Sequence, residues 1–315
     1  MDPTDQDIIV LHKEGLYFAP GNFYLDPQVP VETAVISHAH GDHFINGHKT
    51  VYCTNGTDLL IRQRIKNYFG KKILKDYHQE FIVNNCQVMF IPAGHILGSA
   101  QVKIVHQGRS YIYTGDFKLS PDSTCEPFEI VQADVLITET TFAEKGLKHP
   151  DIPSEIAKLK NHDDINIIIG VYSMGKAQRV IQLINEYCPS KKIMVHRSII
   201  LFNKAYESSG FKLGEWIPYD KHSFRKQKNM VYLLPPAQAK NFYPQPNYLR
   251  AFATGWDHLQ ANFDFKLFIS DHADWYDLLT LIEKVQPKQI FTLHGNGKDL
   301  KDHLEPQGIN VTILN

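Results

Sequence analysis

The sequence has little of several features that mark specialised classes of protein. Only four of its 315 residues are cysteine, and no two of them form a C-x-x-C pair, which argues against a disulfide framework or a thiolate zinc site. Its most apolar stretch, Ile165–Val171, is far shorter than the ~20 residues of a membrane-spanning helix. The first residues lack the basic and apolar regions of a secretory signal peptide. We therefore expect a cytoplasmic protein with reduced thiols and no membrane partner.

The composition is that of an ordinary globular chain, except in its histidine content. Hydrophobic residues make up 43% and charged residues 21% of the sequence, which excludes a disordered chain. A length of 315 residues suggests about two domains. Histidine, the commonest metal-ligating side chain, occurs 16 times.

Short apolar or alternating runs dominate the first half of the chain and predict strands. The predicted strands are 23–26, 34–37, 87–91, 101–105, 110–114 and 135–138, and one helix is predicted over 57–68. Later in the chain, strands are predicted over 166–171, 193–195, 267–269 and 289–293, and helices over 154–160, 175–187, 198–208, 274–285 and 299–304. This alternation predicts an α/β fold class with a partly parallel sheet. The proline-rich stretch 234–246 predicts a loop or a crossing between two lobes of the protein.

Two segments carry a surplus of positive charge that the formal net charge of −1 hides. From Leu59 to Lys75 there are six basic residues and no acidic ones. From Glu186 to Met230 there are nine basic residues and four acidic ones. These segments are either solvated helix faces or basic patches for a polyanion. Trp256 and Tyr243 are candidates for stacking on bases, with packing in the fold as the alternative.

The segment Ser37–His43 has the pattern S-H-x-H-x-D-H and directly follows the apolar run 34–36. In extended backbone the side chains of His38 and His40 lie on the same side, so both imidazoles can bind one cation. As the chain turns, Asp42 and His43 can face a second cation. Imidazole and carboxylate are ligands for zinc and similar divalent ions. The segment therefore predicts a metal site.

This motif resembles that of the metallo-β-lactamase superfamily, and four further segments match the superfamily in order along the chain. They are Asp26 in Y-L-D-P, His95 in P-A-G-H-I-L-G-S-A, Asp116 in Y-T-G-D-F and His294 in T-L-H-G. The resemblance implies an αββα sandwich. Because every ligand position holds the expected residue type, it also implies an active enzyme and not a scaffold that has lost its metal.

The resemblance further implies two divalent ions, zinc or, as an alternative, manganese. One ion would be held by His38, His40 and His95, and the other by Asp42, His43 and His294, with Asp116 bridging them. Two such cations lower the pKa of a bridging water and neutralise the phosphate that the water attacks. Asp26 would orient a ligand histidine or the nucleophile.

Three segments resemble the β-CASP nuclease branch of the superfamily. Ile137–Phe142 is similar to its motif A, Ser270–Asp274 to its motif B, and Leu293–Gly295 to its motif C. The resemblance implies a catalytic role for Glu139 and a contact between His272 and the scissile phosphate or leaving group. From about Gly15 to Gly295 the chain looks most like the bacterial ligase-associated DNA exonucleases, long labelled as putative mRNA 3′-end processing factors.

A small β-CASP-like α/β insert is expected between motifs A and B. We expect residues 1–150 and 255–315 to form the metallo-β-lactamase domain, and residues 151–254 to form the insert. Within the insert, Tyr172–Arg179 predicts a strand, a turn and a helix start, where Ser173, Lys176 and Arg179 could bind phosphate. The alternative is a plain turn before a surface helix.

The expected function is a two-metal phosphodiesterase that cleaves DNA, as an exonuclease acting on strand ends in DNA repair. DNA would be the partner, with possible association with a ligase or helicase repair system. The closest alternative is an RNA-processing nuclease similar to RNase J. A small-molecule metallohydrolase of the same fold and a non-enzymatic nucleic-acid scaffold are alternatives from other classes.

Overall fold

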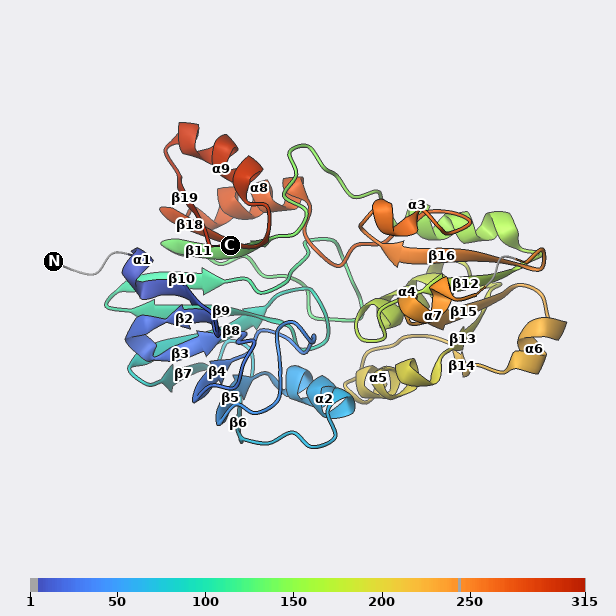
Figure 1. Cartoon of the computed structure of the whole chain (residues 1–315), viewed down its shortest axis with the longest axis horizontal. Helices are drawn as coiled ribbons and strands as arrows, with labels where there is room; N and C mark the ends of the chain where they lie inside the picture. Colours follow the sequence, from blue (N-terminus) through green and yellow to red (C-terminus); the bar gives the residue numbers. More distant parts are fainter. Residues whose placement is uncertain (1–4, 243–244, 315) are drawn as a thin grey trace. The chain divides into compact units, whose positions relative to one another are not determined.

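The protein is described by a computed structural model that covers residues 5–242 and 245–314 (Figure 1). The chain packs into two units. Unit 1 comprises the described residues of 1–121, 125–148 and 272–315, and unit 2 comprises 122–124 and 149–271. No helix in the described ranges is both long and apolar enough to cross a membrane.

The first sheet of unit 1 has six strands in the order β1-β2-β3-β4-β5-β6. They are β1 (Ile9–His12), β2 (Gly15–Phe18), β3 (Phe23–Leu25), β4 (Thr33–Val35), β5 (Thr50–Cys53) and β6 (Lys71–Leu74). β1 to β3 pair antiparallel, and β3 to β6 pair parallel. The short helix α1 (Asp5–Ile8) precedes this sheet, and α2 (Asn55–Arg64) connects the parallel strands β5 and β6.

The second sheet of unit 1 has seven strands in the order β19-β18-β11-β10-β9-β8-β7. They are β7 (Glu80–Val83), β8 (Cys86–Pro92), β9 (Ala100–His106), β10 (Arg109–Tyr113), β11 (Val135–Thr140), β18 (Gln289–Gly295) and β19 (Asn310–Ile313). The two strands β18 and β19 come from the end of the chain and extend the sheet in parallel with β11. Glu139 and His294 therefore lie on neighbouring strands.

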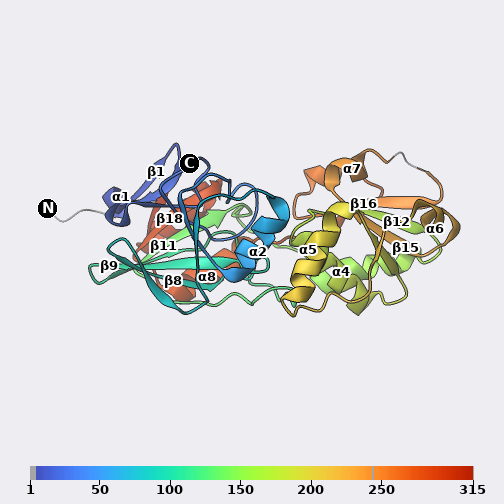
Figure 2. The same cartoon turned by 90° about the horizontal axis from the view of Figure 1, so that it is seen from below.

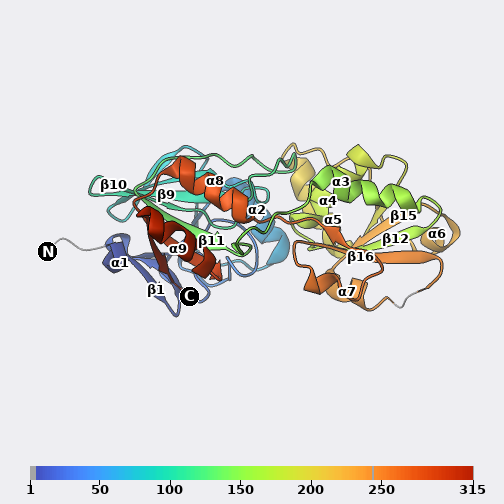
Figure 3. The ribbon, with the colours of Figure 1, turned by 90° about the horizontal axis from the view of Figure 1, so that it is seen from above.

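The two sheets of unit 1 pack face to face and bury one core between them. This core joins residues of the first sheet, such as Phe18 and Val35, to residues of the second, such as Phe90, Val102 and Ile137. The helices α8 (Trp275–Val285) and α9 (Lys298–Leu304) cover the outer face of the second sheet (Figure 3). The result is the predicted αββα sandwich.

Helix α8 shows how the sequence specifies this layer. Asp274 caps its start, because the carboxylate accepts hydrogen bonds from the backbone N–H groups of Tyr276 and Asp277. Apolar side chains then recur at helical spacing and face the sheet: Leu278, Leu281, Ile282 and Val285. Asp274, the last residue of motif B, thus has a structural function.

Unit 2 is a six-stranded, all-parallel sheet in the order β14-β13-β15-β12-β16-β17. The strands are β12 (Asn166–Gly170), β13 (Lys192–Val195), β14 (Ile217–Pro218), β15 (Met230–Leu234), β16 (Tyr248–Thr254) and β17 (Leu267–Phe268). Its helices are α3 (Ile152–Ala157), α4 (Lys176–Tyr187), α5 (Arg197–Ser208), α6 (Lys221–Lys226) and α7 (Pro236–Lys240). Within this unit, α3 and α4 lie on one face of the sheet and α7 on the other (Figures 2 and 3).

The structure departs from the sequence predictions at two places that matter for the site. The predicted helix 57–68 ends at Arg64, where Ile65 turns to extended backbone with φ −123° and ψ 108°. Residues 255–271 were assigned to the first domain, but β17 pairs with β16. The residues up to 271 therefore pack with unit 2.

Candidate metal centre

The predicted metal-binding residues of unit 1 follow the ends of its strands. His38 and His40 come shortly after β4, His95 follows β8, Asp116 follows β10 and His294 lies in β18. After His40 the chain turns, because the N–H groups of His43 and Phe44 both donate to the His40 carbonyl. Strands that are far apart in the sequence thus bring their polar ends to one place.

Four residues form a tight group of possible ligand atoms: His38, His40, His95 and Asp116. His40 Nδ1 lies 3.1 Å from His38 Nε2 and 3.1 Å from His95 Nε2. One carboxylate oxygen of Asp116, Oδ2, lies 3.5 Å from His38 Nε2 and 3.8 Å from His95 Nε2. Donors about 3.3 Å apart are what a tetrahedral zinc ion with bonds of about 2.0 Å requires. Three nitrogens and one oxygen therefore fit one divalent ion.

The protonation states at this group also suit a cation. Burial lowers the pKa of His38 and of His95 well below the usual range of an imidazole, so both rings are neutral, as ligation requires. Burial alone would raise the pKa of Asp116. The neighbouring His43 and His272 instead hold the pKa of this carboxyl well below its usual range, so Asp116 is ionised.

The second predicted ion position is less compact. His43 Nε2 lies 3.3 Å from Oδ1 of Asp116, and the ring of His294 lies with its centroid 5.2 Å from that of His43. Asp42 is exposed in the turn, and its backbone carbonyl accepts a hydrogen bond from Gln28. Asp116 thus presents one oxygen to each position, while Asp42 and His294 lie outside the tight groups found among the described residues.

Asp26 is the centre of a buried hydrogen-bond network next to the cluster. Its carboxylate accepts from the Ser37 N–H at 2.7 Å, the Ser37 hydroxyl at 2.5 Å and the Tyr113 hydroxyl at 2.8 Å. It also lies 2.7 Å from His43 Nδ1. Although burial acts in the opposite direction, Asp116 and Asp26 hold the pKa of His43 well above its usual range. Binding of a cation at His43 would therefore displace a proton.

Ser37 extends this network to a second histidine. Its hydroxyl donates to Asp26 and lies 3.0 Å from His38 Nδ1, so its oxygen can accept a hydrogen bond from the Nδ1–H group and thereby direct Nε2 to the cluster. Asp26 thus orients His43 directly and His38 through Ser37. Neither Ser37 nor Tyr113 was predicted as a site residue, although Ser37 immediately precedes the H-x-H-x-D-H motif.

Ser37→Ala is expected to lower the affinity for zinc by about 10- to 100-fold, the usual cost of removing a partner of a metal ligand. The affinity is measured by competition with a chromogenic chelator, and the protonated ring nitrogen of His38 by ¹⁵N NMR of the metal-free protein. Ser110→Ala is the matched control, because the Ser110 hydroxyl binds Asp134 instead. Wild-type affinity in Ser37→Ala would show that Ser37 does not orient His38.

Glu139 and His272 form a second, partly exposed pair beside the cluster. His272 Nδ1 lies 3.0 and 2.9 Å from the two carboxylate oxygens of Glu139 and 3.9 Å from Oδ2 of Asp116. The buried Glu139 also accepts from the Phe117 N–H at 2.9 Å and the Thr141 hydroxyl at 2.5 Å. Glu139 therefore holds the ring of His272, whose side chain is 28% exposed, and with Asp116 these two residues form a second group of possible ligand atoms.

Lys118 is a further residue of the site that was not predicted from the sequence. Its side chain is fully buried, and its ammonium donates to the carbonyls of Gly94 and His95 at 2.5 and 2.7 Å. It thereby fixes the backbone that carries His95. The only signal in the sequence is its position two residues after Asp116.

The predicted phosphate-binding residues of unit 2 lie in two different environments. Ser173 is half-buried, with its hydroxyl 3.0 Å from that of Ser198. Lys176 and Arg179 are 4% and 1% exposed. Both cations bind Asp271, at 3.0 Å from Lys176 and 2.9 Å from Arg179. The prediction that Lys176 and Arg179 contact phosphate directly is therefore not supported, because burial and ion pairing occupy both groups.

Lys176 and Arg179 instead hold the segment that ends unit 2. Lys176 donates to the Ile269 carbonyl, and Arg179 donates to the Ser270 carbonyl at 2.5 Å. Arg179 Nε also lies 3.4 Å from Asp122. A sequence window around α4 could not reveal these partners, because Asp271 lies 92 residues after Arg179.

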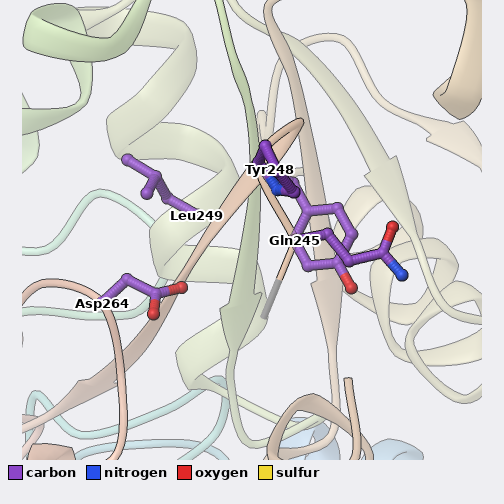
Figure 4. Close-up of a pocket in the computed structure, with 5 residues that line it drawn as sticks. Gln245, Tyr248, Leu249 and Asp264 are labelled. Atoms are coloured by element: carbon purple, nitrogen blue, oxygen red, sulfur yellow. The ribbon is translucent and has the colours of Figure 1, made fainter. Parts of the chain in front are cut away.

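A pocket in unit 2 and the aromatic residue Trp256 add no group of catalytic side chains among the described residues. A shallow pocket of about 410 Å³ in unit 2 is lined by Gln245, Pro246, Tyr248, Leu249 and Asp264 (Figure 4). Its one carboxylate, Asp264, is ion-paired with Arg250 at 3.1 Å. Trp256 is 38% exposed, and Tyr243 lies outside the described residues.

Comparisons with known proteins agree with this geometry. Residues 258–314 match the family model described as "Zn-dependent metallo-hydrolase RNA specificity domain". A probable DNA ligase of Opitutus terrae is 30% identical over 97% of this chain and 31% of its own length. An RNase J-like protein of Methanocaldococcus jannaschii is 32% identical over 52% of this chain and 45% of its own. Integrator complex subunit 11 of Danio rerio is 24% identical over 80% of this chain and 52% of its own.

The chain thus spans about a third to a half of the length of these curated relatives. A crystal structure of a protein of unknown function from Enterococcus faecalis has the same fold, with a TM-score of 0.60 at 14% identity over 90% of this chain and 79% of the other. The sandwich, the cluster of histidines and Asp116, and the relatives agree on one assignment. The chain belongs to the β-CASP nuclease branch of the metallo-β-lactamase superfamily.

Proposed function

We propose that this chain is a metal-dependent phosphodiesterase that cleaves DNA, acting as an exonuclease on strand ends. The observation that carries the proposal is the buried group of His38, His40, His95 and Asp116, next to the pair of Glu139 and His272. The first group suits a divalent cation. The second places a titratable ring beside it, 3.9 Å from Asp116.

In this proposal the residues of the two groups divide the reaction between them. Divalent ions, most simply two zinc ions with manganese as the alternative, supply Lewis acidity toward water and the phosphate. His38, His40 and His95 would hold one ion, and Asp42, His43 and His294 would hold the other, with one carboxylate oxygen of Asp116 available to each. Asp26 and Ser37 keep the ligand rings oriented. His272, held by Glu139, donates a proton to the leaving oxygen.

Unit 2 acts in the proposal as a small β-CASP-like domain, with Ser173 as a candidate phosphate contact. The alignment of nearly the whole chain with part of a protein named a probable DNA ligase supports DNA ends as the substrate and a role in repair beside a ligase. The four cysteines are unpaired and buried, which supports a reducing, cytoplasmic location.

A second candidate, cleavage of RNA, is favoured by a different observation. The matching family model is described as an RNA specificity domain, and the matched relatives include an RNase J-like protein and endoribonucleases. The decisive experiment incubates the protein with matched DNA and RNA strands, labelled at either end, in the presence of zinc or manganese. Stepwise shortening of DNA supports the first candidate, and cleavage of RNA alone supports the second. Cleavage of neither strand contradicts both.

A further inference from the structure

The loop 65–70, between α2 and β6 in unit 1, is basic, carries an exposed aromatic ring, and has no function in the site described above. Its residue Phe69 is 68% exposed. Lys66 and Lys71 are exposed on either side of Phe69, and neither makes an ion pair within the part of the chain that the structure describes. The loop therefore presents a ring between two uncompensated positive charges.

The loop is fixed to the chain that follows the H-x-H-x-D-H motif. Asn46 donates to the Asn67 carbonyl at 2.6 Å and accepts from the Phe69 N–H at 3.1 Å. Gly70, with φ +104°, packs so closely that a Cβ there would lie 2.2 Å from the His48 carbonyl oxygen. The position of Phe69 is thus determined by the segment after the metal-binding turn.

Arg64 joins this loop to the turn itself. Its guanidinium donates to the Phe44 carbonyl at 2.5 Å, and a Cβ added at Gly41 would lie 3.0 Å from its Nη1 atom. Gly41 lies between His40 and Asp42. The basic segment therefore begins in contact with the metal-binding turn and continues to Lys71 on the same unit.

We propose that the segment Lys66–Lys71 is a contact surface for single-stranded nucleic acid. Phe69 stacks on an unpaired base, and Lys66 and Lys71 contact the adjoining phosphates. Exposed aromatic rings interleaved with cations are how proteins bind single strands without reading their sequence. A ring can stack in this way only on a base that is not enclosed in a duplex, so the surface favours single strands. This inference rests on the proposed nuclease function and names where the substrate strand contacts unit 1.

The test measures binding of a fluorescein-labelled 15-nucleotide DNA strand by anisotropy, in EDTA so that no cleavage occurs. Phe69→Ala is expected to weaken binding of the single strand by about 5- to 150-fold, the effect of losing one base–aromatic stack. Phe69→Trp should restore it. The double variant Lys66→Gln with Lys71→Gln is expected to reduce the slope of log K against log salt by about 1.4, or about 0.7 for each phosphate contact.

Two matched controls come from the same unit. Ile82 is 65% exposed and Lys13 has a side chain 89% exposed, so Ile82→Ala and Lys13→Gln remove comparable groups elsewhere. Hydrolysis of bis(4-nitrophenyl) phosphate by the zinc-loaded protein should be unchanged in all these variants, because none of the residues belongs to the metal centre.

The results of these measurements distinguish failure of the proposed contact surface from failure of the proposed nuclease function. If the wild-type protein binds and cleaves oligonucleotides but the variants bind as tightly as the controls, the surface proposal is wrong and only the nuclease function stands. Lys71, the first residue of β6, would then serve to protect this edge strand from pairing with other chains. If the wild-type protein neither binds nor cleaves oligonucleotides, both proposals fail.

Discussion

Asp116→Asn is expected to lower the rate of metal-dependent phosphodiester hydrolysis by at least about 100-fold, since removing a residue that only supports a metal ligand already costs about 10- to 100-fold. Asp116 Oδ2 lies 3.5 Å from His38 Nε2, and its Oδ1 lies 3.3 Å from His43 Nε2. One carboxylate thus serves both predicted ion positions. An amide keeps the shape of the side chain but loses its charge and one of the two acceptor oxygens.

The measurement is kcat/KM on a labelled oligonucleotide, together with the zinc content of each purified variant. Asp302→Asn is the matched control, because Asp302 has a side chain 58% exposed and pairs only with the nearby Lys298 among the described residues. His40→Ala should reduce both zinc content and rate. A folded Asp116→Asn protein that cleaves at the wild-type rate would contradict the assignment of the metal centre.

Arg179→Met is expected to lower the free energy of unfolding of unit 2 by about 3 kcal/mol, the lower end of the range for breaking a buried ion pair. Asp271 loses one of its two cations but keeps its ion pair with Lys176. Arg179 is 1% exposed, and Asp271, 6% exposed, lies 2.9 Å from its guanidinium. Asp122 is a second acidic neighbour of the same group. The variant also removes the donor to the Ser270 carbonyl.

Urea unfolding followed by tryptophan fluorescence suits this measurement, because Trp216 and Trp256 both lie in unit 2. Arg197→Met, at an exposed position of the same unit, should change the unfolding free energy by no more than about 0.5 kcal/mol. If Arg179 bound phosphate directly, its variant would lose affinity for DNA and keep its stability. That pattern would restore the role expected from the sequence.

The four residues of the compact group, His38, His40, His95 and Asp116, could be picked out from the sequence as candidate ligands, because they sit in short motifs at the ends of strands. The H-x-H-x-D-H segment places three histidines and one aspartate within six residues, which is enough to indicate a metal site. The hydrogen-bond partners that hold the residues of the site could not be predicted from short motifs. Tyr113 binds Asp26 across 87 residues of sequence, and His272 binds Glu139 across 133. Such pairs become visible only when the strands are assembled.

The same is true of the fold: elements marked by a local pattern could be predicted, whereas those that depend on contacts distant in the sequence could not. Periodicity located strands such as β11 and helices such as α8 to within two residues. It missed β15, Met230–Leu234, because this short apolar run leads directly into the proline-rich stretch 234–246, which predicts a loop. The sequence pattern also predicted that α2 continues past Arg64. The loop that follows is held by hydrogen bonds with Asn46, and a residue outside the helix cannot be recognised from the helical pattern.

The insertion of unit 2 within unit 1 has a consequence for how the protein is made. The ribosome completes β11 before unit 2 and adds its sheet neighbour β18 only afterwards. Synthesis of the residues between the two strands takes roughly 7–30 s at the usual rate of translation. During that time, unit 2 can fold by itself while the earlier sheet keeps an open edge. Among the proposed metal ligands, His294 is therefore synthesised last, so the second proposed ion position is completed only after the whole of unit 2.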